Sequence, residues 1–291
     1  MPTDTPPQGR PRVHVIHPGT LPASAYGPLG EACTGVDWGV SDLGTRRDYA
    51  HAGFDPAASD LSMDELVTRL LDEDGALLDQ ADLLVGWSFG GLVALAVRER
   101  SPRDPAVLLL DTVAPTIDVE GSRTHLARWF ADYLGTRAGR PLAAPPPGSD
   151  DRREPLAALH GPAVEAGAIA PDVSRGGFLA LARAYTGGLE RNVRMTASRE
   201  WPRPARIALV KPVDGLLPES AANGWEDAAD SVEVIPCPGD HYSMLSDPTS
   251  RGVIAEQIIA RAMEMRPEFS GHITSHPSGA ERNSSSRLGE E

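Results

Sequence analysis

The sequence predicts one large α/β domain with a mostly parallel sheet, helices on both faces and a helical insertion. Its 291 residues, 41% of them hydrophobic, are enough to bury a sizeable core. Residues 81–86 and 106–111 are apolar runs typical of buried strands, and residues 89–100 between them have helical character. A strand, a helix and a strand in this order predict parallel pairing. Residues 116–200 show apolar positions at helical spacing, which predicts helices inserted between two strands.

The elements expected before this central unit follow from local turn and capping signals. The run VHVIH is rich in β-formers and is ended by Pro18 and Gly19. Ser62 with Glu65 three residues later forms a capping box, which predicts the start of a helix. In chain order we expect a flexible, proline-rich lead at 1–11, a strand at 13–17, a short helix within 21–32, a strand within 35–43 and a helix at 62–78.

The elements expected after the central unit complete the domain, which we place at 12–265. Composition changes after residue 265, where serine, glycine, arginine and glutamate dominate, and this predicts a disordered tail at 266–291. In chain order we expect lid helices near 121–134 and 178–189, strands at 205–210 and 231–235, a turn at 236–240 and a closing helix at 253–263.

Charge and composition exclude several classes of function. The formal net charge of -14 argues against nucleic acid or an anionic membrane as a partner. The two cysteines, Cys33 and Cys237, provide neither a disulfide framework nor a zinc spacing, so we expect no metal. The N-terminus does not resemble a signal peptide, and no apolar run approaches the ~20 residues that span a bilayer. We therefore expect a cytoplasmic protein.

A serine between two glycines stands at the junction of the central strand and its helix. Residues 86–90, GWSFG, match the G-x-S-x-G pattern of a nucleophile elbow, in which a sharp turn exposes a serine above the sheet. Ser88 is therefore the candidate nucleophile. The Phe89 amide at the start of the following helix is a candidate oxyanion donor, and the Thr20 amide after the first strand is the second.

A base and an acid are expected at the same edge of the sheet. His241 follows the last expected strand and its turn, and active sites of open α/β sheets lie beyond such strand ends. A carboxylate must orient the base. Asp111 and Asp214 each follow a strand, and the residue pattern alone does not separate them.

The lid offers candidate substrate contacts, although packing explains the same pattern. Any lid helix must cover its apolar face, so aromatic stripes indicate packing as readily as a channel. Arginines of the insertion, Arg123, Arg128 and Arg183, could contact an acidic partner or only solvent. The aromatic residues that could line an acyl channel are Trp129, Phe130, Tyr133, Phe178 and Tyr185.

Three motifs together resemble a known family. The segments GWSFGGLVALAV, LLLDTVAP and PGDHYSML, with HVIHPGT near the start, are similar to the type I thioesterase domains of polyketide synthases and nonribosomal peptide synthetases. The resemblance implies an α/β-hydrolase fold with a helical lid between the sixth and seventh strands. It also favours Asp111 over Asp214, because type I domains have their acid in such a D-x-x-x-P context.

The resemblance implies a reaction and a partner. Ser88 would take a polyketide or peptide chain from the phosphopantetheine thioester of an acyl or peptidyl carrier protein, with no bound cofactor, in secondary-metabolite biosynthesis. Hydrolysis or cyclisation would then release the chain. We expect a free-standing enzyme, and a monomer, because the proline-rich lead cannot form the N-terminal helix through which some relatives dimerise. The alternatives are a carboxylesterase with the same triad and a non-catalytic binding protein.

Overall fold

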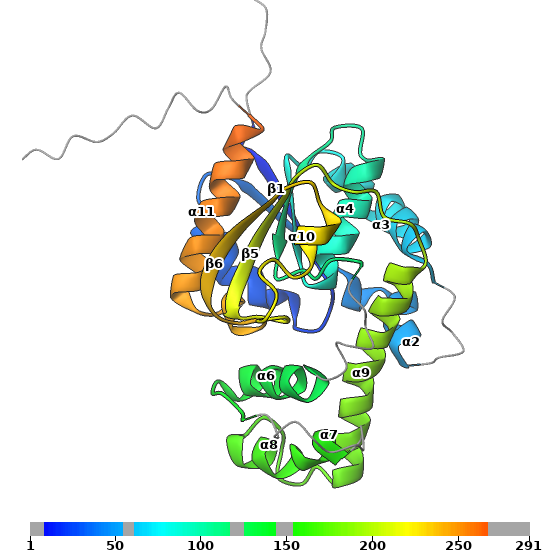
Figure 1. Ribbon diagram of the computed structural model, residues 1–291, viewed down its shortest axis with the longest axis vertical. Coiled ribbons are helices and arrows are strands. Elements are labelled where there is room, and N and C mark those ends of the chain that lie inside the picture. The colour runs from blue at the N-terminus through cyan, green and yellow to red at the C-terminus, as the bar shows by residue number, and fades with distance from the viewer. Residues whose placement is uncertain (1–8, 55–60, 117–124, 144–153, 267–291) are drawn as a thin grey trace, which may run out of the picture.

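Six parallel strands form the centre of the molecule. A computed structural model describes residues 9–54, 61–116, 125–143 and 154–266 (Figure 1). The strand order is β2-β1-β3-β4-β5-β6, and each neighbouring pair is parallel. The strands are β1 (Arg12–His17), β2 (Asp37–Asp42), β3 (Leu83–Trp87), β4 (Ala106–Leu110), β5 (Ile207–Asp214) and β6 (Val232–Asp240).

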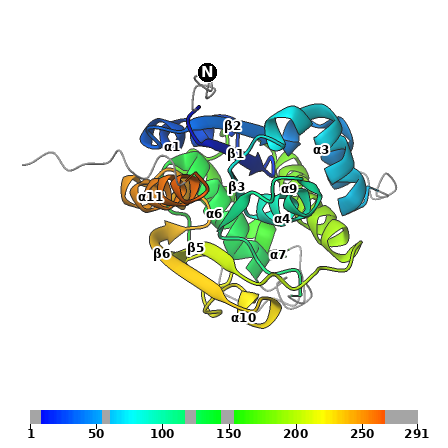
Figure 2. The ribbon, with the colours of Figure 1, turned by 90° about the horizontal axis from the view of Figure 1, so that it is seen from above.

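Helices cover both faces of this sheet (Figures 1 and 2). On β1, Val13 and Val15 point into the core beneath α1 and α11, whereas Ile16 belongs to the core beneath α3 and α4. Because both faces are buried, the central strands are apolar at nearly every position, which is typical of parallel sheets. The helices on these faces are α1 (Gly27–Ala32), α3 (Met63–Leu78), α4 (Phe89–Arg100), α10 (Trp225–Ala228) and α11 (Pro248–Glu264).

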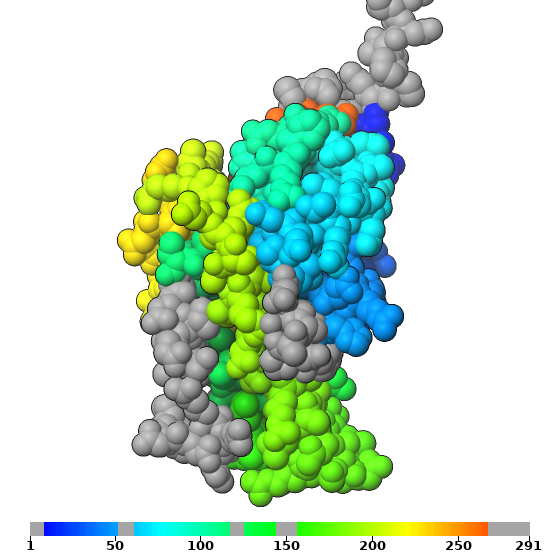
Figure 3. All heavy atoms as spheres, turned by 90° about the vertical axis from the view of Figure 1, so that its right-hand side faces the viewer, coloured from blue at the N-terminus to red at the C-terminus, as the bar shows by residue number. Residues whose placement is uncertain are grey.

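A group of helices between β4 and β5 forms a lid beyond the carboxyl ends of the strands (Figure 1). It consists of α6 (Leu126–Ala138), α7 (Glu154–Ala158), α8 (His160–Ala166) and α9 (Arg175–Ala197). The long helix α9 also packs against α2 (Arg47–Phe54), and Figure 3 shows α9 running from the lid to the body of the molecule. The lid follows the fourth strand and not the sixth, because only four described strands precede it.

Local signals in the sequence agree with most elements. Ser62 caps α3 as expected: the Glu65 amide donates to its hydroxyl at 3.2 Å, and its own amide donates to the Glu65 carboxylate at 2.8 Å. The short helices that connect the main elements are 3-10 helices η1 (Ala23–Tyr26), η2 (Leu43–Thr45) and η5 (Ser243–Leu245).

Two sequence-based expectations differ from the structure. Residues 236–240 continue β6 in place of the expected turn, and β6 lies at the edge of the sheet, where prolines such as Pro236 are tolerated. Arg266, expected to begin the tail, forms an ion pair with buried Asp82 at 3.0 Å. The remainder of the expected lead and tail, at 1–8 and 267–291, lies outside the described residues. Within the described ranges, no helix combines the length and the apolar character needed to cross a membrane.

Candidate active site

Ser88 occupies a strained turn between β3 and α4. Its backbone has φ 56° and ψ -132°, an unusual conformation for a residue with a side chain. A Cβ at Gly86 would lie 2.3 Å from the Gly91 Cα, and one at Gly90 would lie 2.1 Å from the Ile16 carbonyl oxygen. Only glycine fits these two positions, so the glycines flanking the serine are required by the close packing of β1, β3 and α4.

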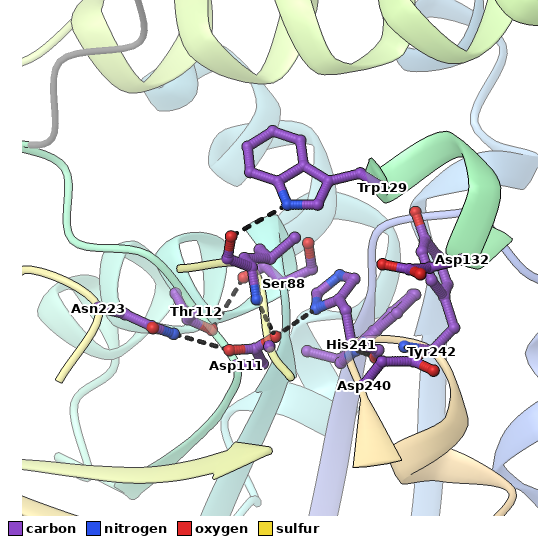
Figure 4. Close-up of polar contacts among 12 residues, drawn as sticks. Ser88, Asp111, Thr112, Trp129, Asp132, Asn223, Asp240, His241 and Tyr242 are labelled. Carbon is purple, nitrogen blue, oxygen red and sulfur yellow. Dashed lines mark hydrogen bonds and ion pairs between the residues drawn. The ribbon is translucent and has the colours of Figure 1, made fainter. Parts of the chain in front are cut away.

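Asp111 contacts His241 at the same edge of the sheet. The residues directly follow β4 and β6, and His241 Nδ1 lies 2.8 Å from an Asp111 carboxylate oxygen (Figure 4). The two side chains are 4% and 0% exposed, so water does not screen their interaction. The Leu216 amide donates to the same oxygen at 2.9 Å, and the Asn223 side-chain amide donates to the other at 2.8 Å. These donors hold the carboxylate in one orientation.

Asp214, the alternative acid, has a different environment. It ends β5 and is exposed. Among the described residues, its carboxylate makes no hydrogen bond or ion pair with His241. The structure therefore brings Asp111, and not Asp214, to the histidine.

Trp87 and Tyr242 hold the imidazole of His241. The Trp87 ring stacks on it with centroids 4.7 Å apart, and the indole N–H donates to the His241 carbonyl at 3.0 Å. The Tyr242 ring packs edge-on against the same imidazole, with ring centroids 5.0 Å apart. Because Nδ1 faces Asp111, Nε2 is the nitrogen left to exchange a proton with a substrate or with Ser88.

Ser88 and His241 line one pocket of about 550 Å³ beneath the lid. In the described part of the chain their side chains are not hydrogen-bonded to each other. Such bonds often form only when a substrate is bound. Phe89 and Thr20, the expected oxyanion donors, line the same pocket. Phe89 is the first residue of α4, where helix N–H groups are free, and Thr20 lies on the loop after β1.

The aromatic residues of the lid divide into two groups. Trp129 and Tyr185 line the pocket. Phe130, Tyr133 and Phe178, also named as candidate channel residues, do not line it, so packing, the alternative to a channel, accounts for these three. Phe130 packs against Phe178 and Tyr133 with ring centroids 5.7 and 6.1 Å apart, because α6 and α9 must bury their facing apolar sides against each other.

Helix α6 is attached to the loop that supports Asp111. The Arg128 guanidinium donates to the carbonyls of Asp214, Gly215 and Leu216 at 3.2, 3.0 and 2.7 Å. The Trp129 indole donates to the Leu216 carbonyl at 3.0 Å (Figure 4). Arg128 therefore has an internal partner. Arg183 is exposed, and Arg123 lies outside the described residues.

Asp132 lies on α6 near this junction and has an unusual ionisation. Burial, followed by the negative charge of Asp240, raises the pKa of its carboxyl to about 7; Arg128 opposes the shift and Asp214 adds to it. The side chain is 21% exposed and lies 3.7 Å from the Arg128 guanidinium. The lid therefore contains a carboxyl group that titrates near neutral pH.

Sequence reasoning did not identify Leu216, Asn223, Trp87 or Asp132. Leu216 acts through its backbone amide, which leaves no trace in side-chain patterns. Asn223 has φ 54° and precedes Gly224, so the Asn-Gly pair was a detectable turn signal. Nothing near Asp132 in the sequence marks it, because Asp240 and Asp214 reach it only through the fold.

Comparisons with known proteins agree on the fold. No family model and no curated protein matches the sequence. The RedJ thioesterase from the prodiginine biosynthetic pathway of Streptomyces coelicolor has a similar structure, with a TM-score of 0.53 and 17% identity over 90% of this chain and 96% of that one. The chain has the α/β-hydrolase fold. The resemblance to thioesterase domains expected from the motifs is thus confirmed at the level of the fold.

A four-domain nonribosomal peptide synthetase bound to AMP and glycine also matches, with a TM-score of 0.54 and 20% identity over 90% of this chain. The chain spans about a fifth of the length of that synthetase, since the match covers 20% of it. At such identities the likeness concerns the architecture alone.

Proposed function

We propose that the protein is a serine-dependent thioesterase. Its substrate would be a polyketide or peptide chain attached as a thioester to the phosphopantetheine of an acyl or peptidyl carrier protein. The supporting observation is the buried contact between His241 and Asp111, 2.8 Å long, beside a strained Ser88 in one pocket. A nucleophile, a base and an orienting acid are the parts that acyl transfer requires.

Acylation would proceed from this arrangement. His241 Nε2 accepts the hydroxyl proton of Ser88 while the serine oxygen attacks the thioester carbonyl. Phe89 and Thr20 both line the pocket, and their amides are the candidate donors to the oxyanion. When the C–S bond breaks, the imidazolium gives its proton to the thiolate, and Asp111 stabilises the imidazolium while it is charged.

Deacylation would release the chain. His241 deprotonates water, or a hydroxyl or amine of the chain itself, which attacks the Ser88 ester. The proton then passes to the serine oxygen, and the product leaves as an acid, lactone or lactam. Apolar residues such as Leu92, Leu126 and Val193 line the pocket and suit an acyl chain.

The test compares two acyl donors on three proteins. An acyl-pantetheine thioester and the matched oxygen ester are offered to the wild type, to Ser88→Ala and to Ser231→Ala, a control at an exposed serine before β6. Intact-protein mass spectrometry detects the acyl adduct. We expect an adduct and preferred thioester turnover for the wild type and the control, and neither for Ser88→Ala.

Each other outcome assigns a different function. Preference for the oxygen ester would contradict the proposal and support a carboxylesterase with the same triad. No adduct and no turnover with either donor would support a non-catalytic binding protein. An adduct that persists in Ser88→Ala would show that another residue is the nucleophile.

A further inference from the structure

Two buried tyrosines share a hydrogen bond in the wall of the pocket. Tyr185 lies on α9 and Tyr242 directly follows His241, so the lid and the body each contribute one. Their hydroxyl oxygens are 2.7 Å apart, and both residues line the pocket. They are only 9% and 3% exposed.

One of the two hydroxyl groups in this pair keeps an O–H that the shared bond does not use. Two hydroxyl groups bring two hydrogens, and the shared bond uses one. In the described residues, the other hydrogen has no acceptor. The hydroxyl of neighbouring Tyr133 accepts a hydrogen bond from the Arg137 guanidinium at 3.2 Å. Burial raises the pKa of both tyrosines, so both hydroxyls keep their hydrogens at neutral pH.

A buried donor without an acceptor is unfavourable until a partner reaches it. Asp132 acts on both tyrosines through its charge, but no hydrogen bond joins it to either among the described residues. The pocket wall formed by α6 and the loop after β5 is apolar, with Leu126, Trp129 and Leu217. The tyrosine pair is therefore a polar point in an apolar wall, one residue from the base.

We infer that the spare O–H of the Tyr185–Tyr242 pair donates to an acceptor oxygen on the bound acyl chain. The pair would then make the pocket select, among acyl chains, those with an acceptor oxygen within its reach over plain alkyl chains. A pocket built around a buried donor discriminates strongly against an analogue that lacks the acceptor. This inference rests on the proposed thioesterase function.

The experiment uses four pantetheine thioesters of equal chain length: octanoyl and its 3-oxo, 5-oxo and 7-oxo analogues. kcat/KM is measured for the wild type, Tyr185→Phe, Tyr242→Phe and the double variant. Each single variant keeps one hydroxyl and its hydrogen, so at least one single variant should retain the wild-type preference. In the double variant, the ratio of kcat/KM for the best oxo substrate over octanoyl should fall at least ~10-fold.

The ratio separates recognition from packing. Loss of packing in the double variant would lower all four kcat/KM values by one factor and leave the ratio unchanged, which would overturn the inference. A wild-type enzyme without any oxo preference, corrected for solution hydrolysis rates, would also overturn it. If the wild type hydrolysed none of the four thioesters, the result would instead contradict the proposed function. The two failures are therefore distinguishable.

Discussion

At the scale of single residues, the site depends on which carboxylate contacts His241. Asp111 has φ 44°, and this positive φ turns the chain sharply after β4. Its carboxylate lies within hydrogen-bond distance of three nitrogen atoms, those of His241, Leu216 and Asn223. Such a carboxylate can hold one imidazole tautomer in place, which an exposed Asp214 cannot do.

Replacing each carboxylate by its amide tests this assignment. We expect Asp111→Asn to lower kcat by about 10⁴, because an amide in that position stabilises the wrong tautomer of His241. Asp214→Asn should change kcat by less than about twofold, since its side chain does not contact the histidine. Thioester hydrolysis measures both rates, and circular dichroism checks that each variant is folded. Equal losses in the two variants would contradict the assignment.

At the scale of elements, the lid helix α6 contacts the loop that binds Asp111. Arg128 and Trp129 bind the Leu216 carbonyl, while the amide of the same residue binds Asp111. Asp132 lies one helical turn beyond Arg128 and has its pKa raised to about 7. A shift in this direction means that the native state binds a proton that the unfolded state has released.

The stability of the protein should therefore depend on pH through Asp132. The native carboxyl ionises near pH 7 and the unfolded one near 3.8, so stability falls as pH rises from about 4 to 7. Asp132→Asn removes this loss. We expect the variant to be more stable than the wild type by about 2–4 kcal/mol at pH 8, with the difference shrinking towards pH 4.

Urea unfolding of both proteins at several pH values measures this difference. Asp230→Asn is the control, because Asp230 is an exposed carboxylate paired with Arg203 at 2.8 Å. A pH-independent difference for Asp132→Asn, or a variant less stable than the wild type at pH 8, would show that the pKa of Asp132 is not raised in the native protein.

At the scale of the whole molecule, an ion pair connects the end of α11 to the segments that begin β1 and β3. Asp82, 4% exposed, lies just before β3 and binds the Arg12 amide of β1 at 2.8 Å. Arg266, just past α11, pairs with the same carboxylate at 3.0 Å, and Arg103 lies 3.6 Å away. These contacts join four segments that are separate in the chain, at Arg12, Asp82, Arg103 and Arg266.

Removing this ion pair should destabilise the fold. Arg266→Ala leaves a buried carboxylate with fewer partners, so we expect a loss of about 1–3 kcal/mol and a lower melting temperature. Arg206→Ala is the control, because Arg206 is 70% exposed in its pair with Glu233 and should cost less than about 1 kcal/mol. Calorimetry compares them, and equal losses would show that the contact of Arg266 contributes no more than a surface pair.

The sequence by itself determined the local elements of this protein. The capping box at Ser62, the strand, helix and strand around Ser88, and the sharp glycine-flanked turn are encoded within a few neighbouring residues. Hydrophobic periodicity and turn chemistry act over that range. The position of His241 after a strand could be predicted for the same reason, as could the two eligible aspartates.

Only the tertiary structure decided how these elements meet. Asp111, and not Asp214, meets His241 across 130 positions of the chain, and it accepts from the Leu216 amide across 105 positions. The hydrogen bond between Tyr185 and Tyr242 joins residues 57 positions apart. Which lid aromatics line the pocket depends likewise on how α6 and α9 pack. Such contacts depend on the relative placement of whole elements, and burial of apolar surface sets that placement without any local sequence signal.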